Sequence, residues 1–103
     1  MNRIEKLLEY LQAEPKDNFL RHALALEYIK IDDDAKARLL FEAILNDSPK
    51  YIGSYYHLGK LLERAGEKQT AIECYEKGMA VAKETDSTHA YNELQAAWED
   101  LVY

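Results

Sequence analysis

The sequence predicts an all-α fold of about six helices that pair as antiparallel hairpins. Two prolines and four glycines are its only strong helix breakers in 103 residues, and segments rich in Ala, Leu, Glu, Lys and Tyr run between them. Much of the chain also recurs at an interval of about 34 residues. The matching pairs are Pro15 and Pro49, Leu24 and Leu58, Ala37 and Ala71, Phe41 and Tyr75, and Glu42 and Glu76. A helical chain with this period predicts stacked, near-identical hairpins that work as a surface rather than as a pocket.

The first half of the chain contains three expected helices. The first covers residues 2–13 and ends before Pro15, because proline disfavours a helical conformation in the residue before it. Its apolar face consists of Ile4, Leu7, Leu8 and Leu11. Asp17 is expected to cap the second helix, whose apolar residues at helical spacing are Leu20, Ala23, Leu24 and Tyr28. The third helix covers residues 33–46 and turns inward the side chains of Ala37, Leu40, Phe41 and Ile44.

The acidic triplet Asp32-Asp33-Asp34 separates the second helix from the third. It predicts a turn followed by an N-cap, with negative charge in the first helical turn. A calcium loop would need alternating oxygen ligands, a central glycine and a closing glutamate, and the sequence here lacks them. We therefore expect a structural role for the triplet.

Three further helices are expected in the second half. They cover residues 51–65, residues 68–83 and a last segment that begins after Thr85-Asp86-Ser87-Thr88 and ends near Tyr103. Gly66 provides the tight turn between the first two. Every connection in the chain is about two to four residues long, and links this short make neighbouring helices run antiparallel.

Composition excludes several classes of partner. The formal net charge is −6, and Lys and Arg are scattered, so we expect neither nucleic acid nor an anionic membrane surface as a ligand. No apolar run approaches the roughly 20 residues of a membrane span. The amino terminus lacks the apolar core of a secretory signal, and a cytoplasmic location is the simplest expectation. Cys74 is the only cysteine and is expected to be a small buried residue, without the base that a nucleophile needs.

These residues resemble the tetratricopeptide repeat (TPR) family, and within it small bacterial-type domain proteins. The second unit matches best, with Tyr55-x2-Leu58-Gly59-x2-Leu62 followed by Ala71-x3-Tyr75-x2-Gly78. The first unit reads Leu24-Ala25-x2-Tyr28, then Ala37-x3-Phe41 and Pro49. It departs from the family pattern at Arg21, where an aromatic residue is preferred, and at Ile44. In the second unit, Lys83 stands where the family often has proline.

The resemblance covers nearly the whole chain and implies a short right-handed superhelical solenoid in a single domain, residues 1–103. A half unit covers residues 2–15, full units cover 17–49 and 51–83, and a capping helix covers 86–103. Small residues such as Gly59 and Ala71 would let the helices of a hairpin approach closely. Large ones such as Phe41 and Tyr75 would fill the space between hairpins, at about 1.5–3 kcal/mol per buried side chain.

The family implies a non-enzymatic adaptor whose concave groove holds a protein or peptide. The groove positions carried over to this sequence are Phe19, His22, Ala23, Leu26, Tyr56, His57, Lys60, Arg64, His89, Asn92, Glu93 and Ala96. The alternative is that these side chains only solvate an exposed face. The family's carboxylate-binding mode is not expected. The sites where the family has lysine, asparagine and arginine read His22, Leu26 and His57 here, and the last helix has no matching pair of cations.

No cofactor, metal or catalytic activity is expected. His22, His57 and His89 come from three different helices without the spacing or carboxylate support of a metal site. The sequence has no phosphate loop, no nucleophile elbow and no paired acid and base. Glu63, Glu67, Glu73 and Glu76 are interpreted as exposed helix charges balanced by Lys60, Arg64, Lys68 and Lys77.

A second function class is self-association. The outer faces of the first and last helices carry exposed-looking aromatic and apolar residues, and a short array can extend its stack across a two-fold axis. These residues are Tyr10, Trp98, Val102 and Tyr103. The chain would then be an assembly element or a homodimer.

Overall fold

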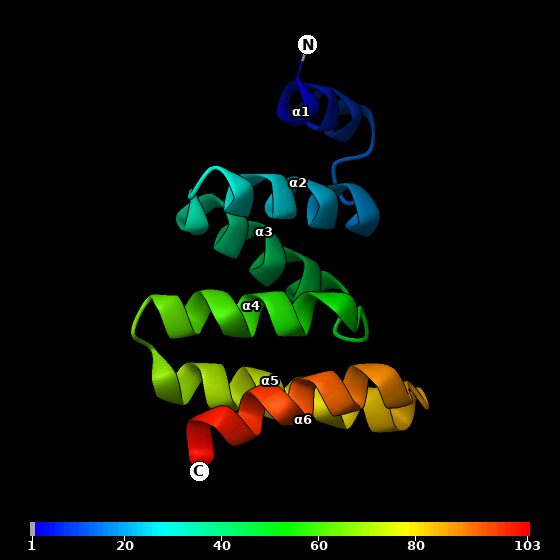
Figure 1. Ribbon diagram of the computed structural model, residues 1–103. Coiled ribbons are helices and arrows are strands. Elements are labelled where there is room, and N and C mark those ends of the chain that lie inside the picture. The colour runs from blue at the N-terminus through cyan, green and yellow to red at the C-terminus, as the bar shows by residue number, and fades with distance from the viewer. Residues whose placement is uncertain (1) are drawn as a thin grey trace. The chain divides into compact units, whose positions relative to one another are not determined.

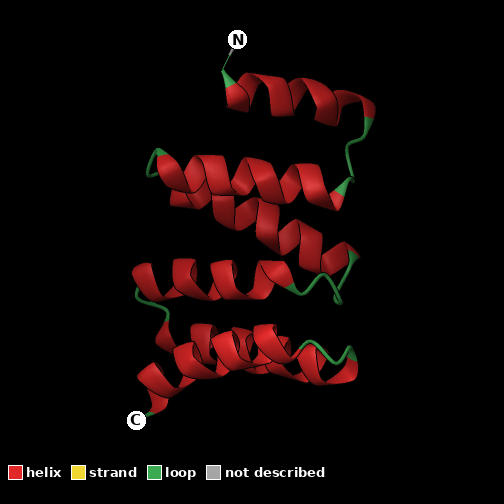
Figure 2. Cartoon of the chain, turned by 45° about the vertical axis from the view of Figure 1, so that its right-hand side comes forward, coloured by secondary structure: helices red, strands yellow, loops and turns green. Residues whose placement is uncertain are grey.

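The computed structural model describes residues 2–103, which form six α-helices and no strand (Figure 2). The helices are α1 (Arg3–Ala13), α2 (Asn18–Lys30), α3 (Asp34–Asp47), α4 (Gly53–Arg64), α5 (Lys68–Glu84) and α6 (Thr88–Val102). The predicted all-α fold class is confirmed, and the expected helix boundaries lie within two residues of the observed ones.

The helices form two units that divide between Ser48 and Pro49. In unit 1, which contains α1 to α3, α2 packs against both α1 and α3 (Figure 1). In unit 2, which contains α4 to α6, α4 and α5 form a hairpin and α6 packs against both of them. The division falls where the sequence predicts the end of the first full repeat. A single domain over residues 1–103 stays a prediction.

Side-chain caps start the three helices of unit 1. The carboxylate of Asp17 accepts a hydrogen bond from the N–H of Leu20 at 2.9 Å, and that of Asp33 accepts one from the N–H of Lys36 at 3.2 Å. Both caps were predicted, and each satisfies one of the N–H groups that a helix start leaves open. Asn2 caps α1 in the same way, through a 2.9 Å bond from the N–H of Glu5.

The two hairpin turns share one geometry. Asp32 (φ 61°) and Gly66 (φ 78°) both take the left-handed conformation, and they occupy equivalent places in the two repeats. In each turn, the N–H of the following residue bonds at 2.9 Å to the carbonyl five residues before it. The α5–α6 turn has the same geometry, with the N–H of Ser87 bonded at 2.8 Å to the carbonyl of Ala82. It differs from the α3–α4 connection, because α5 continues through Lys83, the residue equivalent to Pro49. Asp86 (φ 52°) then takes the left-handed position.

Both units bury the large residues that the repeat predicts. Phe41 and Tyr75 are completely buried, which confirms their predicted place in the core. Leu7 of α1 packs with Ala23 and Leu24 of α2. The prediction for Leu8 was wrong, because this side chain is 44% exposed on the outer side of α1. Within unit 1, α1 packs against α2, and Leu8 lies away from that contact.

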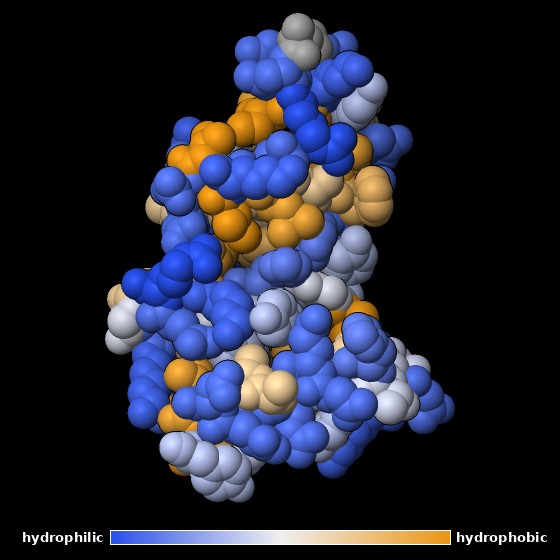
Figure 3. Space-filling view, viewed as in Figure 1, coloured by the Kyte–Doolittle hydropathy of each residue, from blue (hydrophilic) through white to orange (hydrophobic). Residues whose placement is uncertain are grey.

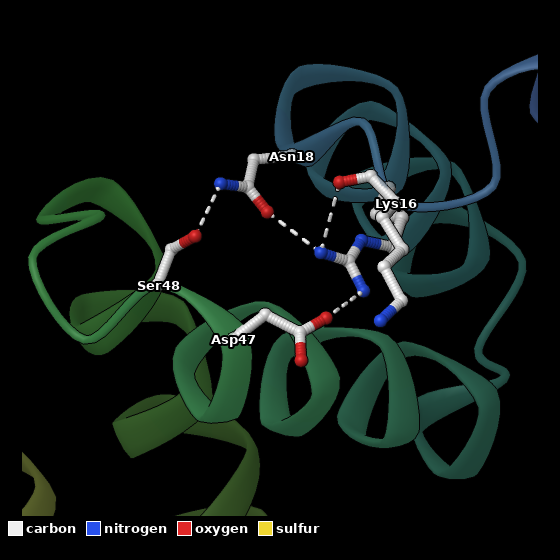
Figure 4. Close-up of polar contacts among 5 residues, drawn as sticks. Lys16, Asn18, Asp47 and Ser48 are labelled. Carbon is white, nitrogen blue, oxygen red and sulfur yellow. Dashed lines mark hydrogen bonds and ion pairs between the residues drawn. The ribbon is translucent and has the colours of Figure 1, made fainter.

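Arg21 is buried, although the sequence reads as a departure from the family pattern there. Its guanidinium donates to the Asp47 carboxylate at 3.0 Å, to the Lys16 carbonyl at 3.1 Å and to Asn18 Oδ1 at 2.7 Å (Figure 4). Asn18 in turn donates to Ser48 Oγ at 2.8 Å. The network joins the start of α2 to the end of α3. It also gives the buried guanidinium the charged and polar partners that compensate for its loss of contact with water.

The equivalent residue in unit 2 is Tyr55, which lies one repeat after Arg21. Its hydroxyl donates to the carbonyl of Pro49 at 2.5 Å. Arg21 and Tyr55 therefore perform the same local task, since each donates to a carbonyl of the turn that precedes its own helix. This shared bond explains how arginine is accepted at a position where an aromatic residue was expected.

No helix within residues 2–103 combines the length and apolar character needed to cross a membrane.

Candidate functional site

In unit 1, the four predicted groove residues line one hollow beside α2. They lie on one side of the helix because their spacing follows its turns. Three charged residues complete the lining. The whole lining consists of Arg3, Phe19, His22, Ala23, Leu26, Glu27 and Lys30. On the face drawn in Figure 3, apolar surface is more extensive over unit 1 than over unit 2.

The four predicted residues are exposed to different degrees. Phe19 is 71% exposed, whereas His22 and Leu26 are half-buried. The His22 ring meets the buried Phe41 ring edge-on, with 5.3 Å between centroids, so its orientation is restrained. Ala23 differs from the expectation of an open groove residue, because it is 9% exposed and belongs to the core. It forms part of the floor of the hollow.

One carboxylate and two cations form the rim of this hollow. Glu27 lies 2.9 Å from Lys30 Nζ and 3.4 Å from Arg3 Nε. The hydrogen bond from Lys30 is the main reason that the pKa of Glu27 is lowered, and the charge of Arg3 adds to it. Since the side chains of Arg3 and Lys30 are 62% and 70% exposed, the rim has an excess of accessible positive charge.

Sequence reasoning missed these rim residues. Glu27 and Lys30 are three residues apart on α2, a spacing that indicates a helix ion pair. Arg3 stands one repeat before Ala37, at a position where both full units have alanine. Arginine at this position could have indicated the rim, because a long charged side chain does not fit the tight contact that alanine makes in the complete hairpins.

In unit 2, the four predicted residues of α4 also share one side of their helix. Lys60 Nζ lies 5.6 Å from the centroid of the Tyr56 ring, within range of a cation–π contact. The ring of Tyr56 meets that of His57 edge-on, with centroids 5.6 Å apart. Arg64 is exposed one turn further on. Together they present an aromatic and cationic strip along α4, which we call the α4 strip (Tyr56, His57, Lys60 and Arg64).

The α6 residues predicted for the groove approach this strip. Helices α4 and α6 are in contact, and the charge of Glu93 acts on His57. Burial lowers the pKa of His57, and Glu93 opposes this shift only in part. His89, Asn92 and Ala96 share the side of α6 that carries Glu93, by their helical spacing, and all three are exposed.

Two of the acidic residues interpreted as exposed, balanced helix charges also bond to a neighbouring helix. Glu63 accepts a hydrogen bond from the hydroxyl of the buried Tyr75 and lies 3.6 Å from Lys60 Nζ. Glu76 accepts one from the indole N–H of Trp98 at 3.1 Å. The interpretation as an exposed charge is confirmed for Glu76, whereas Glu63 is half-buried. Each of the two also joins two helices of unit 2, which the sequence did not indicate.

The described residues do not form a metal site. Within residues 2–103, no three His, Cys, Asp or Glu side chains gather closely enough to hold a metal ion. Cys74 is free and buried, as predicted, and burial raises the pKa of its thiol to about 12. A thiol with such a pKa carries almost no thiolate at neutral pH and is a poor nucleophile.

The repeated hairpins, their buried aromatic residues and their exposed mixed faces define a helical-hairpin repeat protein. The family model for the tetratricopeptide repeat matches residues 52–85. A tetratricopeptide repeat domain protein from Salinibacter ruber, seen in a crystal structure, is 42% identical over 82% of this chain and 94% of its own, with a TM-score of 0.80. The chain therefore belongs to the tetratricopeptide repeat family, as its sequence predicts.

Two other solved structures are similar to the chain. A protein from Bordetella parapertussis is 26% identical, with 98% of this chain and 88% of that chain covered and a TM-score of 0.84. The protein MamA is 25% identical over 93% of this chain and 51% of its own, with a TM-score of 0.74. Comparison with curated proteins gives no match.

Proposed function

We propose that this chain is a non-enzymatic adaptor that holds an extended or helical segment of another protein. TPR domains generally mediate protein–protein interaction. The observation that carries the proposal is the hollow of unit 1, whose lining includes the strongly exposed Phe19 and the half-buried Leu26. An exposed aromatic residue at a hollow with an apolar floor is typical of a site that buries a partner's side chain.

The charges beside this hollow indicate the chemistry of the partner. Arg3 and Lys30 share a single carboxylate, and the α4 strip of unit 2 carries two further cations. Each face thus combines aromatic, histidine and cationic side chains, although the whole chain has a net charge of −6. We infer a partner segment that presents apolar side chains between acidic ones, because opposite charges at the rim favour encounter and register.

A peptide selection tests the proposal with a defined probe. Peptides selected from a random display library against the folded chain are titrated into isotope-labelled protein, and amide shifts are followed by NMR. We expect saturable shifts around α2 and along the α4 strip, and acidic residues among the selected peptides. Phe19→Ala and Tyr56→Ala with His57→Ala should each weaken binding about tenfold or more, as truncation of a central aromatic contact does.

Leu39→Ala is the matched control for Phe19→Ala. Leu39 is also a large apolar residue, 67% exposed, but it lies on α3 and does not line the hollow. Its truncation should leave peptide affinity unchanged. Shifts confined to α3 or to the outer side of α5, or equal affinity of the Phe19→Ala variant, would count against the proposed faces.

A further inference from the structure

A second hollow lies in unit 2, between α5 and α6. It is lined by Glu76, Met79, Ala80 and Lys83 of α5 and by Tyr91 and Trp98 of α6. None of the residues of the α4 strip takes part in it. The proposed function therefore does not account for this hollow.

The two ends of the hollow have opposite charge. At one end, the indole N–H of Trp98 donates to the Glu76 carboxylate at 3.1 Å. At the other end, Lys83 Nζ lies 5.4 Å from the centroid of the Tyr91 ring. Each contact restrains a charged side chain that is still exposed. A carboxylate with several lone pairs and an ammonium with three donors can each take a further partner.

The charges are placed symmetrically about the middle of the hollow. Glu76 and Lys83 are seven residues apart, about two turns of one helix face, and Met79 and Ala80 lie midway between them. A two-fold axis through this midpoint would run α5 of a second copy antiparallel to α5 of the first. Glu76 of each copy would then meet Lys83 of the other, so that one surface complements itself.

We propose that this hollow is a self-association surface that takes a second copy of the chain across this two-fold axis. Ala80, which is exposed, lets two helices approach closely at the axis. Methionine and aromatic residues, which are enriched at protein interfaces, surround it. The ring of Tyr103, 91% exposed, meets the Trp98 ring edge-on at 6.0 Å and extends the apolar area beside the hollow.

Charge explains why a second copy fits this surface. Two chains of net charge −6 repel each other in most orientations. In the proposed pairing, the Glu76 carboxylate of each copy meets the Lys83 ammonium of the other. Among these four charged groups, no two of the same sign come into contact. A partner of a single sign would meet attraction at one end of the hollow and repulsion at the other.

Sedimentation equilibrium of the full chain over a wide concentration range tests the association. Trp98 is the only tryptophan, so its emission reports burial of this hollow in particular. We expect a dimer whose formation shifts the emission to the blue. Lys83→Glu and Glu76→Lys should each weaken the dimer at least about tenfold, because like charges would then oppose each other at two places.

A mixture of the two variants separates this pairing from a loss of folding. In the mixture, one chain offers two acids and the other two bases, so the variants should associate with each other although neither associates with itself. Lys77→Glu, with the same change of net charge on the same helix, should dimerise nearly as the parent does. A parent that stays monomeric, or variants that do not associate when mixed, would overturn the proposal.

Discussion

The ring of Tyr75 occupies the space directly beside Gly59. A β-carbon on residue 59 would overlap Cε1 of Tyr75 and lie 2.6 Å from its Cζ. Tyr75 cannot easily move away, because it is completely buried and its hydroxyl donates to the Glu63 carboxylate. Helices α4 and α5 therefore approach closely only because residue 59 has no side chain.

Gly59→Ala should destabilise unit 2, although alanine is the better helix former. The intrinsic gain in helix propensity is about 1 kcal/mol. Overpacking against a fixed ring costs about 1–3 kcal/mol, and the severe overlap here places the cost at or above the upper end. We expect the free energy of unfolding to fall by about 2 kcal/mol or more, measured by urea denaturation.

A double-mutant cycle isolates the cause of this loss. Tyr75→Leu removes the ring, so adding Gly59→Ala to that variant should cost much less than it does in the parent. Tyr75→Phe keeps the ring and should not relieve the overlap. Equal costs of Gly59→Ala in the parent and in the Tyr75→Leu variant would show that the contact does not determine stability.

Arg21→Ala should be among the most damaging substitutions in unit 1. It removes hydrogen bonds to Asp47, to the Lys16 carbonyl and to Asn18. A hydrogen bond that involves a charged group contributes about 1.5–3 kcal/mol to stability. We expect a net loss of about 2–3 kcal/mol in the free energy of unfolding. Arg21→Tyr should lose less, because tyrosine fills this position in the second repeat and bonds to the equivalent turn.

Arg38→Ala is the control for the loss of charge. Arg38 Nε pairs with Glu42 at 3.2 Å on the surface of α3, and exposed ion pairs contribute about 0–1 kcal/mol. Thermal and urea unfolding of the three variants should therefore rank Arg38→Ala as the mildest and Arg21→Ala as the most severe. An Arg21→Ala variant as stable as Arg38→Ala would contradict the structural role of the buried network.

The features that the sequence predicted correctly depend on local chemistry. Asp17 and Asp33 cap helices because their side chains reach an N–H three residues ahead. Gly66 takes the left-handed conformation at no steric cost because it lacks a β-carbon. Phe41 and Tyr75 are buried because the same pattern of small and large residues appears twice at one interval, and a repeat constrains packing beyond single positions.

The features that it did not predict depend on contacts between distant residues. The bond from Arg21 to Asp47 joins positions 26 residues apart, and no periodic pattern contains it. The rim of the unit 1 hollow needs Arg3 of α1 to meet Glu27 of α2. Leu8 follows the apolar spacing of α1 but is exposed, because α1 packs against α2 by one side only. Apolar periodicity alone therefore overestimates the number of buried residues.

Cys74 should resist thiol reagents in the folded chain. Its thiol lies in the core of unit 2 and donates to the Tyr55 carbonyl at 3.4 Å, and burial raises its pKa to about 12. The reagent therefore has little access to the sulfur atom, and little of the thiol is present as the reactive thiolate. At pH 8 we expect reaction with an aromatic disulfide to be at least about a hundredfold slower than in denaturant, and to follow the opening of the unit. Rapid labelling in native buffer would show that α5 does not pack as described.

His57 should make the free energy of unfolding depend on pH just below neutrality. Burial lowers its pKa from the ordinary value of 6.5, so the folded chain binds a proton there less readily than the unfolded chain does. The stability linked to His57 is then fully present above pH 6.5 and is lost as the pH falls from 6.5 through the folded pKa. His57→Gln should flatten this part of the stability profile. Subtracting the profile of the variant from that of the parent removes the contributions of the other titrating groups.

The pKa shift of His57 can also be separated into its two causes by NMR titration. Because the charge of Glu93 raises the pKa of His57 against the effect of burial, Glu93→Gln should move the titration midpoint of the His57 ring further down. Glu99→Gln, an equal change of charge at an exposed position further along α6, should leave the midpoint nearly unchanged. Equal midpoints in the parent and in Glu93→Gln would mean that Glu93 does not act on His57, and that α4 and α6 do not form one face there.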